Sequence, residues 1–451
     1  MTSFLADRFS YVFGLGKSGR SALGYFQKQN LPVKAWDDTL ETRQVLDPTL
    51  LQDPKDVNWS HVERIILSPG IPHEGPKANP ALIAAKDHNI PLVVDVELFL
   101  ERALRHPNHT IVGITGTNGK STTTSLLTHL LNHLGKKAIA AGNIGTPVLD
   151  LPETNEETYY VLELSSYQLT LLKTPRLDVA ILINITPDHL AYHGTMEAYV
   201  AAKSSIFEQV QHQKGVIIID DAYTQQIYKK NPFLMSISTE TEEGKISIHQ
   251  GILKDKERNI TFTLPTLSQL QGSHNAQNIG ACYGALCHLI PETFCMETFI
   301  EGLQTFKALP HRQEIVAQTN QVIFVNDSKA TNMDAAEKSL KTFQNIHWIL
   351  GGEGKVGETP ASLKHLFPHV KHVYLVGSSM DFFEKEIRGL IAYTRSHTVE
   401  QATDEAFHQS QKGDVILLAP ACASFDQFKN FEERGSVFKT CALKLVDQYH
   451  E

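Results

Sequence analysis

The chain has 451 residues, 41% of them hydrophobic, and a formal net charge of -9. This length exceeds what one hydrophobic core usually supports, so we expect two or three domains. The negative charge argues against nucleic acid or an anionic membrane as the main partner, because both attract basic surfaces.

The cysteines and the N-terminus indicate the cellular compartment. The five cysteines are odd in number and form no Cys-x-x-Cys pair, which favours free thiols in a reducing environment. No apolar run approaches the roughly 20 residues that span a bilayer. Charged residues stand where a signal peptide would be apolar. We therefore expect a soluble cytoplasmic enzyme.

The first motif in chain order is a glycine turn after a short strand. Tyr11-Val-Phe13 leads into Gly14-Leu-Gly16-Lys-Ser-Gly19, and Asp37-Asp38 follow a helical pattern. This is the dinucleotide-binding pattern, so an NAD-dependent oxidoreductase is one alternative. Any nucleotide diphosphate can use the same turn. Further on, the strand Arg64–Leu67 ends in the turn Ser68-Pro69-Gly70, where ligands of parallel sheets bind.

A second glycine loop, Thr115-Gly-Thr-Asn-Gly-Lys-Ser121, has the composition of a phosphate-binding loop. The preceding residues 111–114 predict a buried strand, and residues 122–131 predict a helix. The helix N-terminus attracts phosphates, Lys120 adds a positive charge, and Ser121 offers a hydroxyl to Mg²⁺. Ile114 stands where the strict P-loop pattern requires glycine, which indicates a variant loop.

Three further candidates follow the loop. Glu163 ends the apolar strand 159–163, where an unpaired carboxylate is costly, so it is predicted to bind Mg²⁺. His189 follows the strand 179–184, and a histidine in such a place more often has a structural role. Lys203 lies in a helical pattern, and its spacing alone does not distinguish it from a solvated lysine.

The second half of the chain predicts a small antiparallel segment, a helix and another parallel sheet. Alternating residues between 240 and 264 indicate the antiparallel segment. Asn275 and Asn278 share one face of the helix 272–289, where they either contact adenine or cap the helix. Apolar strands at 322–326, 348–350, 373–376 and 415–418 each end in polar residues or glycine, so functional side chains gather at their carboxyl ends.

Taken together, these motifs resemble the Mur ligases of peptidoglycan synthesis. The residues that carry the resemblance are Thr115–Ser121, Gly142-Asn-Ile-Gly145, Leu162-Glu-Leu-Ser-Ser166, Asp188-His189 and His274-Asn275. Asn326-Asp-Ser-Lys-Ala-Thr-Asn332 and Ala421-Cys-Ala-Ser-Phe-Asp-Gln-Phe-Lys-Asn-Phe431 resemble the members that add D-glutamate. The motifs are collinear over essentially the whole chain.

The resemblance implies an α/β fold of three domains. Residues 1–105 would form a Rossmann-like domain for a UDP substrate. Residues 106–307 would form a central P-loop-type ATPase domain with a mostly parallel sheet. Residues 308–451 would form a Rossmann-like domain for the amino acid. A monomer is expected.

The implied reaction joins D-glutamate to UDP-N-acetylmuramoyl-L-alanine. ATP phosphorylates the substrate carboxylate, and the amine attacks the resulting acyl phosphate. Two Mg²⁺ ions and a carbamate formed from CO₂ on Lys203 are implied as well. A carbamate oxygen can bind Mg²⁺, whereas an ammonium cannot. Other amino-acid ligases of the superfamily, and a nucleotide-binding regulatory module, are the remaining alternatives.

The resemblance assigns a role to each candidate residue. The catalytic residues are Lys120, Glu163, His189 and Lys203, and the metal ligands are Ser121, Glu163, His189 and Lys203. ATP contacts are Gly116, Thr117, Asn118, Gly119, Lys120, Ser121, Thr122, Asn275, Asn278, Arg312 and Asp327. Contacts to the UDP substrate are Lys17, Ser18, Asp37, Asp38, Ser68, Pro69, Gly70 and Asn143. D-glutamate contacts are Lys329, Thr331, Lys355, Ser424 and Phe431.

One departure from the family pattern follows His189. The family usually continues with Asp-Arg after Asp188-His189-Leu190, and this chain has Ala191-Tyr192. The ion pair is lost, so a supporting role of these two positions toward His189 is in doubt.

Overall fold

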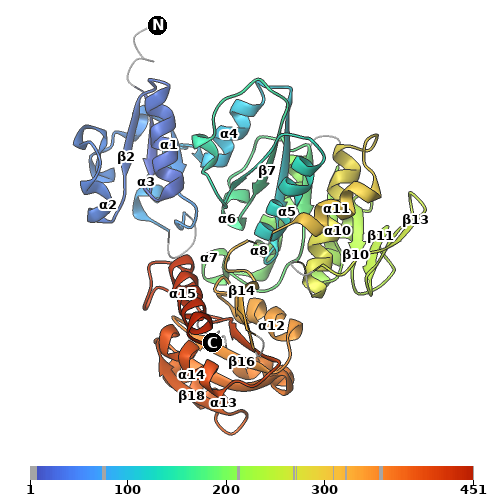
Figure 1. Ribbon diagram of the computed structural model, residues 1–451. Helices are drawn as coiled ribbons and strands as arrows, with labels where there is room; N and C mark the ends of the chain where they lie inside the picture. Colours follow the sequence, from blue (N-terminus) through green and yellow to red (C-terminus); the bar gives the residue numbers. More distant parts are fainter. Residues whose placement is uncertain are drawn as a thin grey trace, which may run out of the picture. The chain divides into compact units, whose positions relative to one another are not determined.

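Three β-sheets organise the protein. The computed structural model describes residues 8–73, 78–210, 214–267, 270, 272–307, 309–319, 322–354 and 359–449 (Figure 1). The sheets have four, nine and six strands and follow one another along the chain. All pairings in the first sheet and most in the other two are parallel, which confirms the predicted α/β class.

The first sheet has the strand order β2-β1-β3-β4. Its strands are β1 (Phe9–Phe13), β2 (Val33–Trp36), β3 (Val62–Leu67) and β4 (Leu92–Val93). Its helices are α1 (Lys17–Lys28), α2 (Leu40–Gln44) and α3 (Pro80–Asp87). The next helix, α4 (Asp95–Ala103), contacts α1, and its Phe99 packs on Tyr160 of the second sheet. Helix α1 packs on β1, β2 and β3 (Figure 1).

The second sheet has the order β13-β12-β11-β10-β9-β8-β5-β7-β6. Its parallel strands are β5 (His109–Thr115), β6 (Ala138–Gly142), β7 (Thr158–Glu163), β8 (Val179–Leu182), β9 (Gly215–Ile218), β10 (Met235–Ser238) and β11 (Ile246–His249). The strands β12 (Ile252–Asp255) and β13 (Ile260–Thr263) extend it in antiparallel fashion, which confirms the predicted antiparallel segment.

Helices around the second sheet carry several candidate residues, among them Lys120, Lys203 and Asn278. They are α5 (Lys120–His133), α6 (Ser166–Leu169), α7 (Leu190–His193), α8 (Met196–Ser204), α9 (Ala222–Lys230), α10 (Ser273–Leu289) and α11 (Met296–Thr305). Thr195 caps α8 by accepting a hydrogen bond from the N–H of Ala198. This cap fixes the start of α8, and Lys203 then lies in its last turn.

The third sheet has the order β14-β15-β19-β16-β17-β18. Its strands are β14 (Glu314–Gln318), β15 (Val322–Asn326), β16 (Ile346–Gly351), β17 (Val370–Val376), β18 (Tyr393–His397) and β19 (Asp414–Leu418). Its helices are α12 (Met333–Thr342), α13 (Met380–Ile387), α14 (Val399–Gln409) and α15 (Phe431–Tyr449). The edge strands β14 and β18 lie outside the four strands predicted from the sequence.

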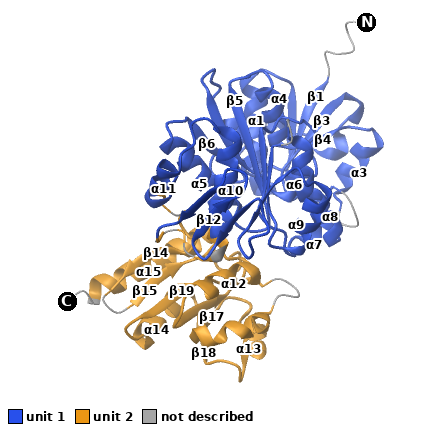
Figure 2. Cartoon of the chain, turned by 90° about the vertical axis from the view of Figure 1, so that its right-hand side faces the viewer, with its two compact units in different colours: residues 1–265, 276–305 blue, residues 266–275, 306–451 orange. Residues whose placement is uncertain are grey.

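The chain folds into two compact units (Figure 2). The first unit comprises residues 1–265 and 276–305 and holds the first two sheets. The second comprises residues 266–275 and 306–451 and holds the third sheet. The three domain boundaries given above stay a prediction. Within the described ranges, no helix combines the length and the apolar composition needed to cross a membrane.

Two glycines of α1 provide a test of how closely strand and helix approach. A Cβ on Gly19 would meet the carbonyl oxygen of Gly14 at 1.9 Å, whereas a Cβ on Gly24 would meet nothing within 4 Å. We expect Gly19→Ala to destabilise the protein by roughly 1–3 kcal/mol, as in overpacked cores. Gly24→Ala, on the same helix, is the matched control and should be neutral or slightly stabilising. Thermal unfolding of both variants checks this, and equal melting temperatures would contradict the close approach.

Candidate active site

The phosphate loop joins β5 to α5 as predicted. Gly119 is the N-cap of α5 and has a φ of 86°, a left-handed conformation that favours glycine. A Cβ at Gly119 would also meet the side-chain oxygen of Asn278 at 2.6 Å. Ser121 and Thr122 lie in the first turn of α5, where backbone N–H groups have no partner inside the helix itself and point toward an anion at the helix N-terminus. The local geometry therefore suits a phosphate.

Asn184 shapes this loop, although sequence reasoning assigned it no role. Its carbonyl oxygen accepts a hydrogen bond from the N–H of Thr117 at 2.9 Å, and its side-chain oxygen accepts one from Asn118 at 2.9 Å. The signal available in the sequence was an asparagine directly after an apolar strand. Because Asn184 holds two consecutive N–H groups, it sets the path of the loop backbone.

Two lysines meet at the carbonyl oxygen of Gly116. Lys120 Nζ donates to it at 2.8 Å, and Lys203 Nζ donates to it at 2.7 Å. Lys203 is only 1% exposed, and burial, followed by the charge of Lys120, lowers the pKa of its ammonium well below the ordinary value. The structure therefore brings Lys203 to the phosphate loop, a placement that its spacing in the sequence did not reveal.

Glu163 lies near Lys203, on which its charge acts, and is almost completely buried. Its Oε1 accepts a hydrogen bond from the side chain of Asn143 at 3.0 Å, and its Oε2 has no hydrogen-bond partner among the described residues. An unpaired buried carboxylate oxygen is costly unless a cation compensates it. This observation fits a divalent metal at Glu163, and it places Asn143 beside the carboxylate.

His189 stands directly before the short helix α7. It has a left-handed backbone conformation (φ 55°) and is the N-cap of α7. Its Nε2 lies 3.5 Å from Oδ2 of Asp188, and its ring centroid lies 5.0 Å from that of Tyr167. Within the described ranges, no three His, Cys, Asp or Glu side chains are arranged to hold a metal ion. A metal at Glu163 or His189 would therefore need other donors too.

The candidate residues for the UDP substrate lie at the carboxyl edge of the first sheet. Ser68 Oγ donates to the carbonyl oxygen of Gly14 at 2.8 Å, which ties the turn after β3 to the turn after β1. Asp37 accepts from the N–H of Leu15 at 2.6 Å, so it supports the glycine turn directly. The remaining candidates follow the same strands: Lys17 and Ser18 begin α1, Asp38 follows β2, and Pro69 and Gly70 follow β3.

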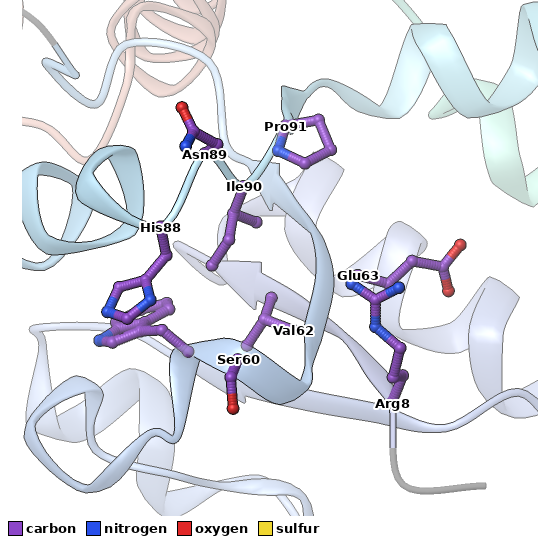
Figure 3. Close-up of a pocket in the computed structure, with 9 residues that line it drawn as sticks. Arg8, Ser60, Val62, Glu63, His88, Asn89, Ile90 and Pro91 are labelled. Carbon is purple, nitrogen blue, oxygen red and sulfur yellow. The ribbon is translucent and has the colours of Figure 1, made fainter. Parts of the chain in front are cut away.

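A hollow at the other edge of this sheet is a separate feature (Figure 3). Its lining includes Arg8, Val62 and Pro91, which lie at the amino ends of β1, β3 and β4. The candidate substrate residues follow the carboxyl ends of the same strands. The hollow therefore does not belong to the candidate site.

The candidate nucleotide contacts are found in both units. Asn278 accepts a hydrogen bond from Thr123 of α5 at 3.0 Å, beside the phosphate loop. Asn275, the last residue of the segment 266–275 that belongs to the second unit, is buried in the first turn of α10. In the second unit, Asp327 follows β15, is buried, and accepts a hydrogen bond from the hydroxyl of Ser339. The charge of Arg312 acts on Asp327, so these two candidates are neighbours.

The candidate D-glutamate contacts lie at the carboxyl edge of the third sheet. Lys329 Nζ lies 4.1 Å from the ring centroid of Phe431, a cation–π distance. Thr331 follows β15 and is partly buried, and Ser424 follows β19 and is buried. Lys355 lies outside the described residues.

Arg434 connects the loops of this region, and sequence reasoning missed it. It is 1% exposed and donates to the carbonyl oxygens of Ser328, Cys422 and Ala423 at 2.8, 3.0 and 3.2 Å. It therefore joins the loop that carries Lys329 to the loop that carries Ser424. An arginine in the first turns of a helix rich in charged residues gives no sequence signal of such burial.

Comparisons with known proteins identify the family. The model described as "Mur ligase middle domain" matches residues 114–286, and "Mur ligase, glutamate ligase domain" matches residues 311–422. The UDP-N-acetylmuramoylalanine--D-glutamate ligase of Paramagnetospirillum magneticum is 39% identical, over 95% of this chain and 94% of that protein. The chain belongs to the Mur ligase family. The enzyme of the same name from Rickettsia felis is 37% identical to this Mur ligase, over 98% and 97% of the two chains.

Solved structures agree with this Mur ligase at the level of the fold. MurF ligase from Thermotoga maritima in complex with ADP has a TM-score of 0.60 at 18% identity, over 99% of this chain and 100% of that chain. The UDP-N-acetylmuramate-alanine ligase MurC from the same organism has a TM-score of 0.59 at 15% identity, over 98% and 99%. At such identities the likeness shows the fold alone. The predicted membership in the Mur ligases is confirmed by the curated relatives.

The buried Asp327 gives a prediction about pH. Burial raises its pKa to about 6 in the folded protein, from 3.8, although the hydrogen bond from Ser339 and the charge of Arg312 act in the opposite direction. Between these values the folded state binds the proton more tightly than the unfolded state, so this carboxyl makes stability fall as pH rises. Asp327→Asn should therefore raise the melting temperature at about pH 8, and the gain should shrink toward about pH 5.

Melting curves of Asp327→Asn across this range check the prediction. The exposed Asp447 on α15 offers a matched control, since Asp447→Asn is the same substitution at the surface and should leave the melting temperature close to that of wild type. If the gain in melting temperature of Asp327→Asn stayed constant from about pH 5 to about pH 8, the carboxyl would not titrate as described.

Proposed function

We propose that this Mur ligase uses ATP to join D-glutamate to UDP-N-acetylmuramoyl-L-alanine in peptidoglycan precursor synthesis, and thereby serves cell-wall growth and division. The observation that carries the proposal is the match to ligases of this name at 37–39% identity over nearly the whole chain. The candidate residues of the site support it, because cations and helix N-termini suit a reaction among several anions.

The reaction moves one phosphoryl group and forms one amide. The substrate carboxylate attacks the terminal phosphorus of ATP, which gives an acyl phosphate and ADP. The amine of D-glutamate then attacks the acyl carbon, loses a proton and expels phosphate. The phosphate loop and Lys120 bind the phosphates and stabilise the charge that develops on the transferring group. Lys329 and Ser424 offer a cation and a hydroxyl to the carboxylates of D-glutamate.

Magnesium ions fit the residues near the phosphate loop. Ser121, Glu163, His189 and a carbamate on Lys203 would hold them, and a bound ion neutralises phosphate charge. The unpartnered Oε2 of Glu163 supports this assignment. The carbamate would form when the neutral amine of Lys203 attacks CO₂ and releases a proton. Burial and the nearby charge of Lys120 favour the neutral amine that this step requires.

The proposal extends to the substrate-binding regions and the compartment. The turns of the first sheet, at Lys17, Ser18, Asp37, Asp38 and Ser68–Gly70, would bind the uridine diphosphate. The domain roles assigned to residues 1–105, 106–307 and 308–451 belong to the same proposal. All five cysteines are free thiols, which supports a reducing cytoplasm as the place of the reaction.

The first test measures ADP release by the purified protein. With ATP, Mg²⁺ and UDP-N-acetylmuramoyl-L-alanine present, ADP should form only when D-glutamate is added. L-lysine and L-alanine are the matched controls, because neither has the side-chain carboxylate that D-glutamate would offer to Lys329. Equal turnover with either amino acid would contradict the specificity, and no turnover with D-glutamate would contradict the proposed reaction.

The second test concerns Lys203. Lys203→Ala should reduce turnover by at least about 100-fold, because a buried charge-stabilising group is removed. Small carboxylates such as acetate should restore part of the activity if a carbamate normally occupies this place. Lys230→Ala, at the exposed end of α9, is the matched control and should retain full activity. Wild-type turnover of Lys203→Ala would exclude the assigned role.

A further inference from the structure

A cluster of aromatic rings surrounds His189, and the reaction described above assigns no role to its other members. We call it the aromatic cluster. Its members are His73, Tyr167, His189, Tyr192, His193 and Tyr199. They come from the turn after β3, from α6, from the segment around α7 and from α8, so four separate stretches of the first unit meet here.

Tyr192 makes two different contacts within the aromatic cluster. Its hydroxyl shares a hydrogen bond of 3.0 Å with Nδ1 of His73. Its ring meets that of Tyr167 edge-on, with centroids 4.4 Å apart and an interplanar angle of 77°. Edge-to-face packing holds aromatic rings in a defined orientation, so the position of the hydroxyl follows from the packing of the ring.

The hydrogen bond between the Tyr192 hydroxyl and His73 connects Tyr192 to the candidate substrate turn Ser68–Gly70. His73 lies three residues after Gly70, and the turn Ser68–Gly70 is joined to Gly14 through the hydrogen bond of Ser68 Oγ. Three residues of backbone leave the chain little freedom between the two points. A hydrogen bond at His73 therefore restricts the turn that we assign to the uridine diphosphate.

The contact between the rings of Tyr192 and Tyr167 connects Tyr192 to His189 and, through further aromatic residues, to the phosphate loop. Tyr167, on which Tyr192 packs, lies 5.0 Å from the His189 ring between centroids. His189 and His193 both lie near Tyr199, at 6.4 and 5.2 Å between centroids. The hydroxyl of Tyr199 shares a hydrogen bond of 3.0 Å with Thr117 of the phosphate loop. The aromatic cluster thus reaches from the first sheet to the ATP loop.

We propose that Tyr192 is a positioning residue with two separable roles: its hydroxyl orders the substrate turn through His73, and its ring holds His189 through Tyr167. This inference rests on the proposed function, since it assumes that the turn Ser68–Gly70 binds the UDP substrate. The phenol thereby gives the segment after His189 a support that needs no ion pair.

The test separates the two roles by kinetics. Tyr192→Phe keeps the ring and removes one hydrogen bond, so KM for UDP-N-acetylmuramoyl-L-alanine should rise roughly 2- to 12-fold. The kcat and the KM for ATP should stay unchanged. Tyr192→Leu also removes the ring, so kcat should fall in addition. Tyr228→Phe, on α9 of the same unit, is the matched control and should behave as wild type.

A double-mutant cycle identifies His73 as the partner. His73→Ala should raise KM for the UDP substrate as Tyr192→Phe does, and the double variant should be no worse than either single variant. Calorimetric binding of UDP-N-acetylmuramoyl-L-alanine gives the same comparison without turnover. Unchanged KM and affinity in Tyr192→Phe would overturn the inference, as would additive effects with His73→Ala.

The outcomes for the inference and for the proposed function are distinct. If wild type releases ADP with D-glutamate, and Tyr192→Phe has the same kcat, KM values and substrate affinity, only the inference about Tyr192 is contradicted. If wild type neither binds nor turns over the UDP substrate, the proposed function falls, and the inference falls with it. A loss of melting temperature with equal rises in all KM values would indicate a purely structural role and would overturn the inference as well.

Discussion

The site depends on one constraint, which is that two lysine side chains share a single backbone carbonyl. Lys120 and Lys203 both donate to Gly116, and Lys203 is wholly buried. Two ammonium groups so close repel each other, and burial adds a desolvation cost. An anionic partner relieves both costs. The fold therefore builds a place that attracts an anion and that favours the neutral amine of Lys203.

Parallel sheets explain how residues far apart in the sequence serve this constraint. The phosphate loop follows β5, Glu163 ends β7, and Asn184 follows β8, so neighbouring strands deliver them to the same edge. The same rule applies to the first sheet, whose turns after β1, β2 and β3 gather the candidate substrate residues. It also applies to the third sheet, where Lys329 and Ser424 follow adjacent strands β15 and β19. Each sheet thus gathers its candidate residues at one edge.

Sequence reasoning succeeded where a local pattern determines the geometry. The phosphate loop, the apolar strands and the helix with Asn275 and Asn278 depend on neighbours in the chain, and the structure has them as predicted. It could not reveal contacts that only folding creates. The burial of Lys203, the hydrogen bond between Tyr192 and His73, and the buried Arg434 join residues separated by 87, 119 and 106 positions. The resemblance singled out Lys203, which spacing did not, and the role that it implies stays a prediction.

The buried Arg434 also bears on the order in which the protein is completed during synthesis. Its acceptors lie in the loops after β15 and β19, whereas Arg434 itself belongs to α15, which follows both loops in the chain. Until α15 leaves the ribosome and docks, the carbonyl groups of both loops lack this donor, and buried unpaired carbonyls are costly. The contact between these two loops of the third sheet is therefore completed only after α15 has been made. A chain that ended before α15 would therefore lack the donor that joins these two loops.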